Sequence, residues 1–322
     1  MKSVSIIIPT YNEEKNIMNC LNSIFFQEYP KKLLEVLVLD GGSTDKTVEI
    51  AKKMGAKVIN NPFKTEERGR GIGFKKARGE IVGTIDADNL IPEDNQWLKR
   101  IIKPFEDKGI SASDTTHMSY RPKDSIVTKY NCLVGGDDPI ASYLRINDRY
   151  CYFTGRIVGT PHKEKDFGDY IEVILDKEKI PAAGSNAFFF RKKIFKEMNC
   201  EVYNHSVFVY KMVKKGYNKM AKTKCSIIHV QSGSIKTYFK KKIRRMERRD
   251  KEELEWEYNY GLTKKEIFRC FLYISTIILP LIDTIRGFYK KPTPAWLFHP
   301  IATFGLLFIY SFYWIKGLNK KL

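Results

Sequence analysis

The chain has 322 residues, an ordinary hydrophobic content of 43% and a formal net charge of +19. That length allows one large domain with an appendage or two modest domains, and a basic balance is typical of proteins that bind nucleic acid, an anionic membrane or an acidic substrate. Six cysteines without Cys-x-x-Cys spacing indicate reduced thiols in a cytoplasmic compartment and exclude a cysteine zinc site or a disulfide framework. The chain opens in an apolar strand pattern, so we expect no secretory signal.

Strand and helix patterns alternate over the first ninety residues. The expected strands are residues 4–8, 34–39, 57–60 and 81–85. The expected helices run from Ile17 to Phe25, over 47–54 and up to Arg78, the last after a Gly/Arg-rich loop at 62–73. This alternation predicts an α/β fold with a mostly parallel sheet, in which ligands bind at the carboxyl ends of the strands. Thr10, Asp40 and Asp86 all fall at such ends.

Two carboxylates, Asp86 and Asp88, follow the apolar run at 81–85. At a spacing of two residues they lie on one side of the chain and repel each other, so a divalent cation between them and an anionic ligand is the economical explanation. Mg²⁺ or Mn²⁺ held by few protein oxygens and by substrate phosphates is the usual arrangement. A polar turn after a strand is the alternative.

Four motifs occur in order around these carboxylates: Pro-Thr-Tyr-Asn-Glu at 9–13, Asp-Gly-Gly-Ser-Thr-Asp-Lys-Thr at 40–47, Arg-Gly-x-Gly-x-x-x-Ala-x-Gly at 70–79 and Asp-Ala-Asp-Asn at 86–89. Together they resemble a family 2 glycosyltransferase of the Rossmann-like GT-A fold. The resemblance implies a nucleotide-sugar donor, Mn²⁺ or Mg²⁺ as cofactor, and inversion at the anomeric carbon. A dinucleotide fingerprint at 69–73 fits less well, because no strand runs directly into it.

The resemblance also implies roles for individual residues. Donor contacts would come from Pro9, Thr10, Tyr11, Glu13, Asp40, Arg70 and Asp86, with Thr10, Tyr11 and Glu13 lining the nucleoside pocket and Arg70 near the base or phosphates. Asp88 would be the principal metal ligand, with Asp86 beside it. The family often has Asn where Gly71 stands, so the chain departs from the pattern at that position.

The middle of the chain carries fewer signals. We expect a helix over 97–105 and strand and loop over 110–126. The acidic pair Asp137 and Asp138 either binds the acceptor or begins a helix, and the helix start is the better interpretation. The resemblance resumes at 181–191, where Gly184, Ser185 and Asn186 correspond to the family's acceptor-side motif.

Two histidines are further candidates. Family members usually carry a Glu-Asp pair before a downstream Gly-Tyr, and the Asp serves as general base. Here Asn204 and His205 stand in that place. An alcohol loses its proton as it attacks, so His205 is a candidate base or acceptor contact, whereas a phosphate acceptor needs no base. His229 follows a strand and, by resemblance to several branches of the family, would complete the metal site. A structural role is the alternative for each.

The C-terminal part has the chemistry of a membrane surface. Residues 236–251 combine apolar and many basic side chains, typical of a helix in the headgroup region. Residues 267–285 and 296–315 are apolar runs with basic residues at every end. A re-entrant hairpin with all ends on the cytoplasmic side fits this charge better than two transmembrane helices do. Two buried helices of a soluble domain are the third alternative.

These patterns predict a glycosyltransferase domain at 1–232, a basic amphipathic region at 233–265 and a hydrophobic hairpin at 266–322. We expect a metal-dependent inverting transferase at the cytoplasmic face of the cell membrane, taking a UDP- or GDP-sugar to a lipid-linked or membrane-proximal acceptor. A soluble-acceptor polysaccharide synthase and a non-catalytic nucleotide-sugar scaffold are the alternatives. A nucleic-acid partner is not expected, because it would leave Asp86, Asp88 and the apolar tail unexplained.

Overall fold

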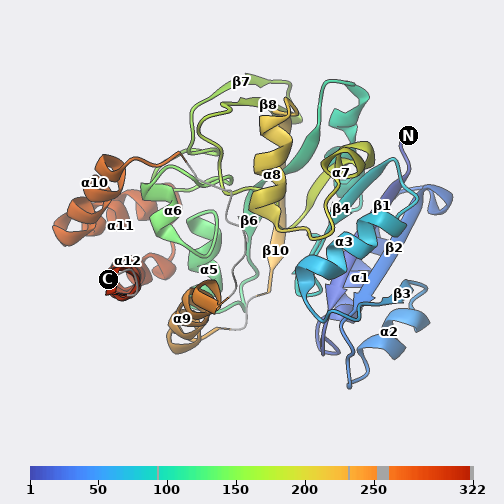
Figure 1. Ribbon diagram of the computed structural model, residues 1–322, viewed down its shortest axis with the longest axis horizontal. Coiled ribbons are helices and arrows are strands. Elements are labelled where there is room, and N and C mark those ends of the chain that lie inside the picture. Colours follow the sequence, from blue (N-terminus) through green and yellow to red (C-terminus); the bar gives the residue numbers. More distant parts are fainter. Residues whose placement is uncertain (93, 231–232, 252–260, 320–322) are drawn as a thin grey trace. The chain divides into compact units, whose positions relative to one another are not determined.

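The computed structural model describes residues 1–92, 94–230, 233–251 and 261–319 (Figure 1). The chain forms two compact units, residues 1–117 with 161–230 and residues 118–160 with 231–322. The first unit therefore has an insertion, and residues 118–160 cluster with the C-terminal helices although they lie within the 1–232 range expected as one domain.

A single mixed sheet organises the first unit, and ten strands belong to it within the described residues, in the order β3-β2-β1-β4-β9-β6-β10-β8-β7 with β5 paired to β10. The strands are β1 (Val4–Thr10), β2 (Leu34–Asp40), β3 (Lys57–Asn60), β4 (Ile81–Thr84), β5 (Asn89–Leu90), β6 (Ala112–Ser119), β7 (His162–Asp166), β8 (Tyr170–Leu175), β9 (Phe188–Arg191) and β10 (Lys219–His229). Strands β3, β2, β1 and β4 are parallel, and β9 runs antiparallel to β4 and β6. The four expected N-terminal strands are confirmed.

Helices cover both faces of this sheet. They are α1 (Ile17–Phe25), α2 (Thr47–Lys53), α3 (Glu66–Lys76), α4 (Trp97–Ile102), α7 (Lys192–Met198) and α8 (His205–Lys214), with short 3₁₀ turns at Lys31–Leu33 and Lys103–Glu106. Because side chains alternate along a strand, neighbouring residues of β9 serve opposite faces: Phe190 packs against Phe74 and Phe208, and Phe189 packs against Trp97.

We expected a loop over 62–73, but the structure has helix α3 over most of that range, so this expectation was wrong. The three glycines of α3 lower helix propensity, but they permit close packing. A Cβ on Gly73 would lie 2.7 Å from a methyl group of Ile7, and one on Gly71 would lie 2.1 Å from the carbonyl oxygen of Glu201. Tertiary packing thus overrides local propensity, and it places Arg70 on a rigid helix.

The second unit is helical within the described residues. Its elements are α5 (Ile126–Leu133), α6 (Pro139–Tyr143), α9 (Ile235–Lys251), α10 (Lys264–Ser275), α11 (Ile278–Lys290), a 3₁₀ turn at Pro294–Leu297 and α12 (Phe298–Asn319). The Asp138 carboxylate accepts from the backbone N–H of Ile140 at 2.9 Å, which confirms the helix-start interpretation. On α9, the buried ring of Tyr238 packs against Phe298, so part of the apolar side expected to face lipid faces protein.

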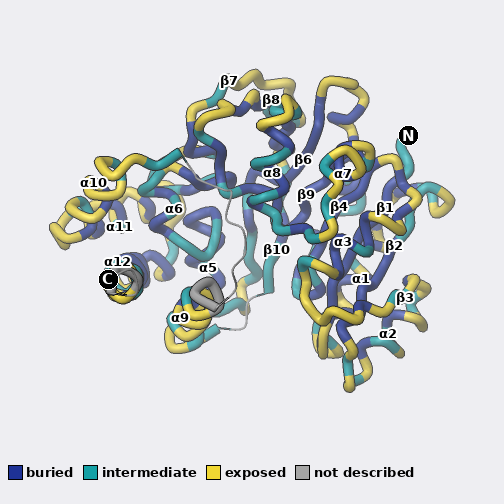
Figure 2. The backbone as a smooth tube through the Cα atoms, viewed as in Figure 1, coloured by how far each residue is buried: buried dark blue, intermediate teal, exposed yellow. Residues whose placement is uncertain are grey.

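Figure 2 shows many exposed residues on α10 and α11. In the described part of the chain, one helical segment, Pro294–Lys316, is long and apolar enough to cross a membrane by length and composition. Helices α10 and α11 would make a second crossing only if they counted as one span, but they bend by 83° at the break between them. The apolar run expected over 267–285 is therefore two helices.

Candidate active site

The carboxyl ends of β1 and β2 form one wall of the candidate site. Thr10 and Asp40 are register partners, and Asp40 accepts from the backbone N–H groups of Gly42 and Ser43 at 3.0 and 3.2 Å. Thr10 is buried, and its hydroxyl has no hydrogen-bond partner among the described residues. Tyr11, the next residue, is 57% exposed. The wall thus presents the exposed ring of Tyr11 beside the Asp40 carboxylate, with the Thr10 hydroxyl buried behind them.

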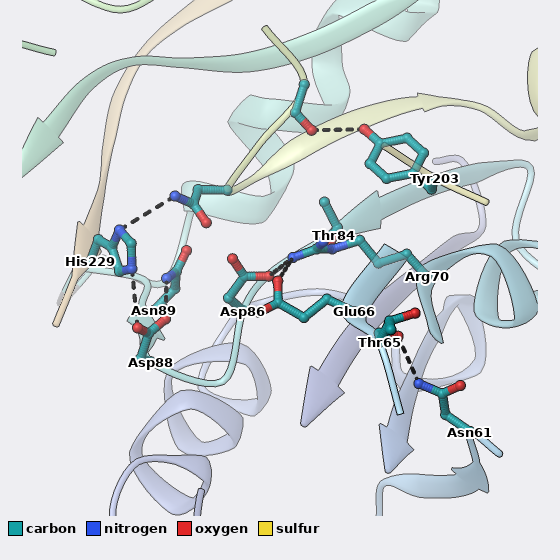
Figure 3. Close-up of polar contacts among 12 residues, drawn as sticks. Asn61, Thr65, Glu66, Arg70, Thr84, Asp86, Asp88, Asn89, Tyr203 and His229 are labelled. Atoms are coloured by element: carbon teal, nitrogen blue, oxygen red, sulfur yellow. Dashed lines mark hydrogen bonds and ion pairs between the residues drawn. The ribbon is translucent and has the colours of Figure 1, made fainter. Parts of the chain in front are cut away.

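A buried arginine fixes the first carboxylate at the end of β4 (Figure 3). Arg70 on α3 reaches Asp86 with Nη2 at 2.6 Å and Glu66 with the same nitrogen at 3.1 Å, while its Nε donates to the hydroxyl of Thr84 at 3.1 Å. Burial works against the charged guanidinium, but Asp86 and Glu66 outweigh it and raise the pKa of Arg70. Asp86 is consequently held in one position by a charged partner.

The second carboxylate meets a histidine from the far end of the sequence. Strand β10 pairs with β5 so that His229 lies opposite Asn89, and the His229 Nε2 atom is 3.1 Å from Asp88 Oδ2. The side-chain amide of Asn89 donates to Asp88 Oδ1 at 2.9 Å. On the other side of the imidazole, Asn186 Nδ2 lies 3.5 Å from His229 Nδ1. Two distant segments are therefore joined at Asp88.

A strained loop delivers Asn186 to this position. Gly184 has φ +101°, and a Cβ there would lie 2.9 Å from the carbonyl oxygen of His205. Asn186 and Ala187 also have positive φ, 42° and 63°, which is costly for a residue with a Cβ. Tyr203 holds the loop by donating its hydroxyl to the Gly184 carbonyl at 2.7 Å. Such strain persists only where surrounding structure enforces it, and it is typical of functional sites.

His205 is the first residue of α8. Asn204 caps that helix by accepting from the backbone N–H of Val207 at 3.3 Å, so the Asn that stands in place of the family's Glu has a structural task. The backbone of His205 packs against Gly184, and its side chain is partly exposed. The contact between Gly184 and the His205 backbone thus brings the predicted acceptor-side loop next to the residue that is the candidate base.

Comparison with known proteins decides the family. The model of glycosyl transferase family 2 matches residues 5–198, more than half of the chain. The chain belongs to glycosyl transferase family 2. It is 37% identical over 113 residues to glycosyltransferase AglE of Haloferax volcanii, covering 33% of this chain and 36% of that protein. It is 36% identical over 113 residues to the dolichyl N-acetyl-alpha-D-glucosaminyl phosphate 3-beta-D-2,3-diacetamido-2,3-dideoxy-beta-D-glucuronosyltransferase of Methanococcus voltae, covering 33% and 35%.

These matches span about a third of the length of each curated relative. Among solved structures, the mannosyltransferase PcManGT of Pyrobaculum calidifontis, determined with GDP-Man and Mn²⁺, is similar over 100% of this chain and 88% of that one, with a TM-score of 0.54 and 17% identity. Likeness at that identity shows the fold alone. The GT-A fold expected from the sequence is confirmed.

The residues that meet at Asp88 fit a divalent metal. Asp88 and His229 offer an oxygen and a nitrogen that already converge. No group of three His, Cys, Asp or Glu side chains among the described residues is close enough to hold a metal. Two protein ligands suffice where diphosphate oxygens and water complete the shell. Asp86 differs, because its Oδ1 is engaged by Arg70.

The surroundings are strongly anionic. Burial raises the pKa of Glu13, and the charges of Asp88, Asp45 and Glu66 raise it further. A cation would relieve this repulsion, and imidazole nitrogen with carboxylate oxygen suits Mn²⁺ better than Mg²⁺.

Three contacts were not anticipated from the sequence. Glu66 lies four residues before Arg70, a spacing that indicates a helical ion pair once α3 is recognised as a helix. Asn89 is the fourth residue of the Asp-Ala-Asp-Asn motif, so the motif itself offered a signal for it. For Tyr203 we find no signal in the sequence, because its partner is a backbone carbonyl in a distant loop.

Proposed function

We propose that this protein is a metal-dependent inverting glycosyltransferase that moves a sugar from a UDP- or GDP-sugar to a lipid-linked or membrane-proximal acceptor at the cytoplasmic face of the cell membrane. The observation that carries the proposal is the 3.1 Å approach of His229 to Asp88 at the strand edge where Arg70 fixes Asp86. This arrangement offers a cation site beside an anchored carboxylate. Together they suit a nucleoside diphosphate with its metal.

The chain's own residues would divide the work. A divalent ion on Asp88 and His229 supplies charge neutralisation for the leaving diphosphate. Thr10, Tyr11 and Asp40 would bind the nucleoside, and Asp86 would orient the ribose or sugar because Arg70 holds it rigid. The acceptor oxygen forms a bond to the anomeric carbon as the bond from that carbon to the phosphate oxygen breaks, and the electron pair leaves with the nucleoside diphosphate.

The acceptor's proton needs a destination when the acceptor is an alcohol. His205 would take it, because neutral imidazole is a base near physiological pH. A phosphate acceptor is already anionic and would leave His205 with a binding task. The name of the Methanococcus voltae relative describes a dolichyl-phosphate-linked acceptor. That name and the apolar C-terminal helices support a lipid-linked acceptor here.

The test is binding of UDP and GDP, each with and without Mn²⁺, to the intact protein and to Asp88→Ala. We expect one nucleotide to bind in a Mn²⁺-dependent manner and the substitution to weaken that binding at least 100-fold. Asp166→Ala is the matched control, because Asp166 is an exposed carboxylate paired with Lys224 on the surface. Binding that ignores both the metal and Asp88 would refute the donor-site proposal.

A non-catalytic nucleotide-sugar scaffold is the second candidate. The replacement of the family's Glu-Asp pair by Asn204, a helix cap, and His205 favours it. Release of nucleotide from UDP- or GDP-sugars in the presence of membrane lipid extract separates the two. Mn²⁺-dependent binding without release would assign the scaffold role, and release above the rate of Asp88→Ala would assign the enzyme.

A further inference from the structure

The second unit carries a concentrated apolar surface on α10 and α11. Their large apolar and aromatic side chains that are more than a third exposed are Ile267, Phe268, Phe271, Leu272, Ile278, Leu281, Ile282, Ile285, Phe288 and Tyr289. Ile277, in the break between the two helices, is also 57% exposed. Figure 2 shows this exposure along both helices. A contiguous patch of this kind marks a binding surface for a protein or a membrane.

We propose that α10 and α11, here called the wedge, insert into one leaflet of an anionic bilayer without crossing it. The arms have 12 and 13 residues, so each is about 18 to 20 Å long. With the 83° bend between them, the tip lies about 12 Å below its two ends. The hydrocarbon core is about 30 Å thick, so this depth stays within one leaflet.

A proline in the sequence causes the bend, and a hydrogen bond between the two helices stabilises it. Pro280 lies in the first turn of α11, and in a continuous helix its ring would clash with the carbonyl group of Thr276. Across the bend, Tyr273 of α10 donates to the carboxylate of Asp283 on α11 at 2.8 Å. The carboxylate of Asp283 also pairs with Arg286 at 3.1 Å. Straightening the wedge into one span would break the Tyr273 contact.

The polar groups at the tip are satisfied internally, as hydrocarbon requires. Backbone N–H groups of Thr276, Ile277, Ile278 and Leu281 donate to carbonyl oxygens within the wedge, and that of Leu279 donates to the hydroxyl of Thr276. The hydroxyls of Ser275 and Thr276 donate to the carbonyl groups of Phe271 and Tyr273, each at 2.8 Å. The break in the helices therefore leaves these donors paired without water.

Charge complementarity identifies an anionic bilayer as the partner. Lys264 and Lys265 begin α10, and Lys290 and Lys291 end α11, so both ends of the wedge are basic and the tip carries no charge. Arg269 lies halfway along α10, from which its long side chain reaches the interface. Each basic residue near an anionic surface adds about 1 kcal/mol of attraction.

Helix α12 is long enough to span but is tied into its own unit. His299 is fully buried, with Nδ1 2.8 Å from the hydroxyl of Tyr130 and Nε2 2.9 Å from that of Tyr143. Further along, the hydroxyl of Tyr310 bonds to the carboxylate of Asp138. Removing α12 to cross a bilayer would strip these partners, so we infer that its buried side stays packed in its own unit.

The experiment adds the full-length protein to preformed liposomes of phosphatidylcholine and phosphatidylglycerol in a 7:3 ratio. A membrane-impermeant amine reagent then modifies exposed lysines, which mass spectrometry quantifies against detergent-lysed liposomes. For each lysine we take the ratio of its modification in intact liposomes to its modification after lysis. We expect this ratio to be the same for the lysine pairs at 264–265 and 290–291 and for Lys316, because all of them lie on the outer side. Protection of 290–291 alone would show that the wedge spans, and protection of Lys316 would show that α12 does; either result overturns the proposal.

A matched pair of variants tests whether the wedge itself binds. Ile278→Asp places a charge at the tip, where Ile278 is 65% exposed and the fold should tolerate it, and should lower liposome partitioning about 100-fold. Phe268→Asp, at a residue 59% exposed, should act in the same direction. The control is Ile126→Asp on α5, because Ile126 is 55% exposed in the same unit and lies outside the wedge.

Two other outcomes would overturn the proposal. Equal partitioning of Ile278→Asp and the wild type would place the membrane contact elsewhere. A dimer in lipid-free buffer that Ile278→Asp dissociates, together with no liposome binding by the wild type, would assign the apolar surface to a second copy of the chain. Both measurements are made without nucleotide, so their failure leaves the donor-site proposal standing.

Discussion

Two polar clusters, one in each unit, use the same residue types for opposite purposes. At the strand edge of the first unit, the side chains of Asp86 and Asp88 are 25% and 29% exposed, and His229 contacts Asp88 with Nε2 and Asn186 with Nδ1. Among the helices of the second unit, the side chain of Asp283 is 4% exposed, and His299 is bonded through both nitrogens to tyrosine hydroxyls.

The difference lies in how far each carboxylate is shielded from water. Asp283 accepts from Tyr143 and Tyr273 and pairs with Arg286, so its oxygens are used by the protein. Asp88 keeps water access and sits among like charges that raise the pKa of a neighbouring carboxyl. The first cluster can still take up a ligand, whereas the second holds helices together. Composition alone would not separate them.

The largest expected effect concerns a third histidine, His205. If it belongs to the reacting site, His205→Ala should lower turnover by 10²- to 10⁴-fold, the usual contribution of a general base. Binding of the donor nucleotide with Mn²⁺ should change less than threefold, because His205 lies outside the Asp88 contact. Steady-state turnover alongside calorimetric binding measures both. Unchanged turnover would remove the base assignment and favour a phosphate acceptor.

The two bonded histidines give the sharpest test of the comparison. His299→Ala leaves the buried hydroxyl of Tyr130 without its His299 partner, removes one of the two contacts of the Tyr143 hydroxyl and creates a cavity, so it should lower the free energy of unfolding by about 3 kcal/mol. Mn²⁺-dependent nucleotide binding should be unaffected. His229→Ala should do the reverse, weakening Mn²⁺-dependent binding 10- to 100-fold with little change in stability. Urea unfolding and nucleotide titration on both variants measure these effects. If both variants respond in the same way, the distinction between a structural His299 and a ligand-binding His229 is wrong.

The sequence predicted the parts of the site that follow from local pattern. Apolar runs ending in Thr10, Asp40 and Asp86 predicted a parallel sheet with ligands at one edge, and that sheet is present. The contact between Arg70 and Asp86 was missed because the glycines around Arg70 indicated a loop. Whether those glycines form a helix depends on packing against Ile7 and Glu201, which no local pattern encodes.

Contacts between residues far apart in the sequence were the second feature that the sequence alone could not predict. Asp88 and His229 are 141 residues apart, and only the family resemblance suggested that they meet. Residues 118–160 lie inside the range that we assigned to the glycosyltransferase domain, but they cluster with the C-terminal helices. Hydrogen bonds such as that of Tyr143 to Asp283 hold this segment to the C-terminal helices. The local sequence around each residue predicts a helix but not which helix it will contact.

A smaller effect is expected at Asn186, which positions His229. Asn186→Ala removes the polar contact at Nδ1 and should weaken Mn²⁺-dependent nucleotide binding about tenfold, since outer partners of a ligating histidine orient it. Asn186→Asp should restore or tighten Mn²⁺ binding, because a carboxylate accepts from Nδ1–H and increases the basicity of the other nitrogen. Ser185→Ala, in the same loop, is the control. Equal losses in Asn186→Ala and Asn186→Asp would indicate that the loop, and not the contact, matters.

The smallest effect concerns Glu13 and the anionic character of the site. Its pKa is raised, first by burial and then by the charges of Asp88, Asp45 and Glu66. The folded protein therefore holds this proton to a higher pH than the unfolded chain does, and stability is lost as pH rises from the ordinary carboxyl pKa through the raised one. Glu13→Gln avoids this loss of stability, because the glutamine side chain stays uncharged at every pH. In EDTA, the variant should match the wild type in urea unfolding at low pH and be slightly more stable at pH 7, by an amount that solvent screening keeps small. Adding Mn²⁺ with the bound nucleotide should shrink this advantage, because the cation neutralises Asp88. An advantage that is constant across pH would mean that Glu13 does not sense the site's charge, and the case for a cation there would rest on Asp88 and His229 alone.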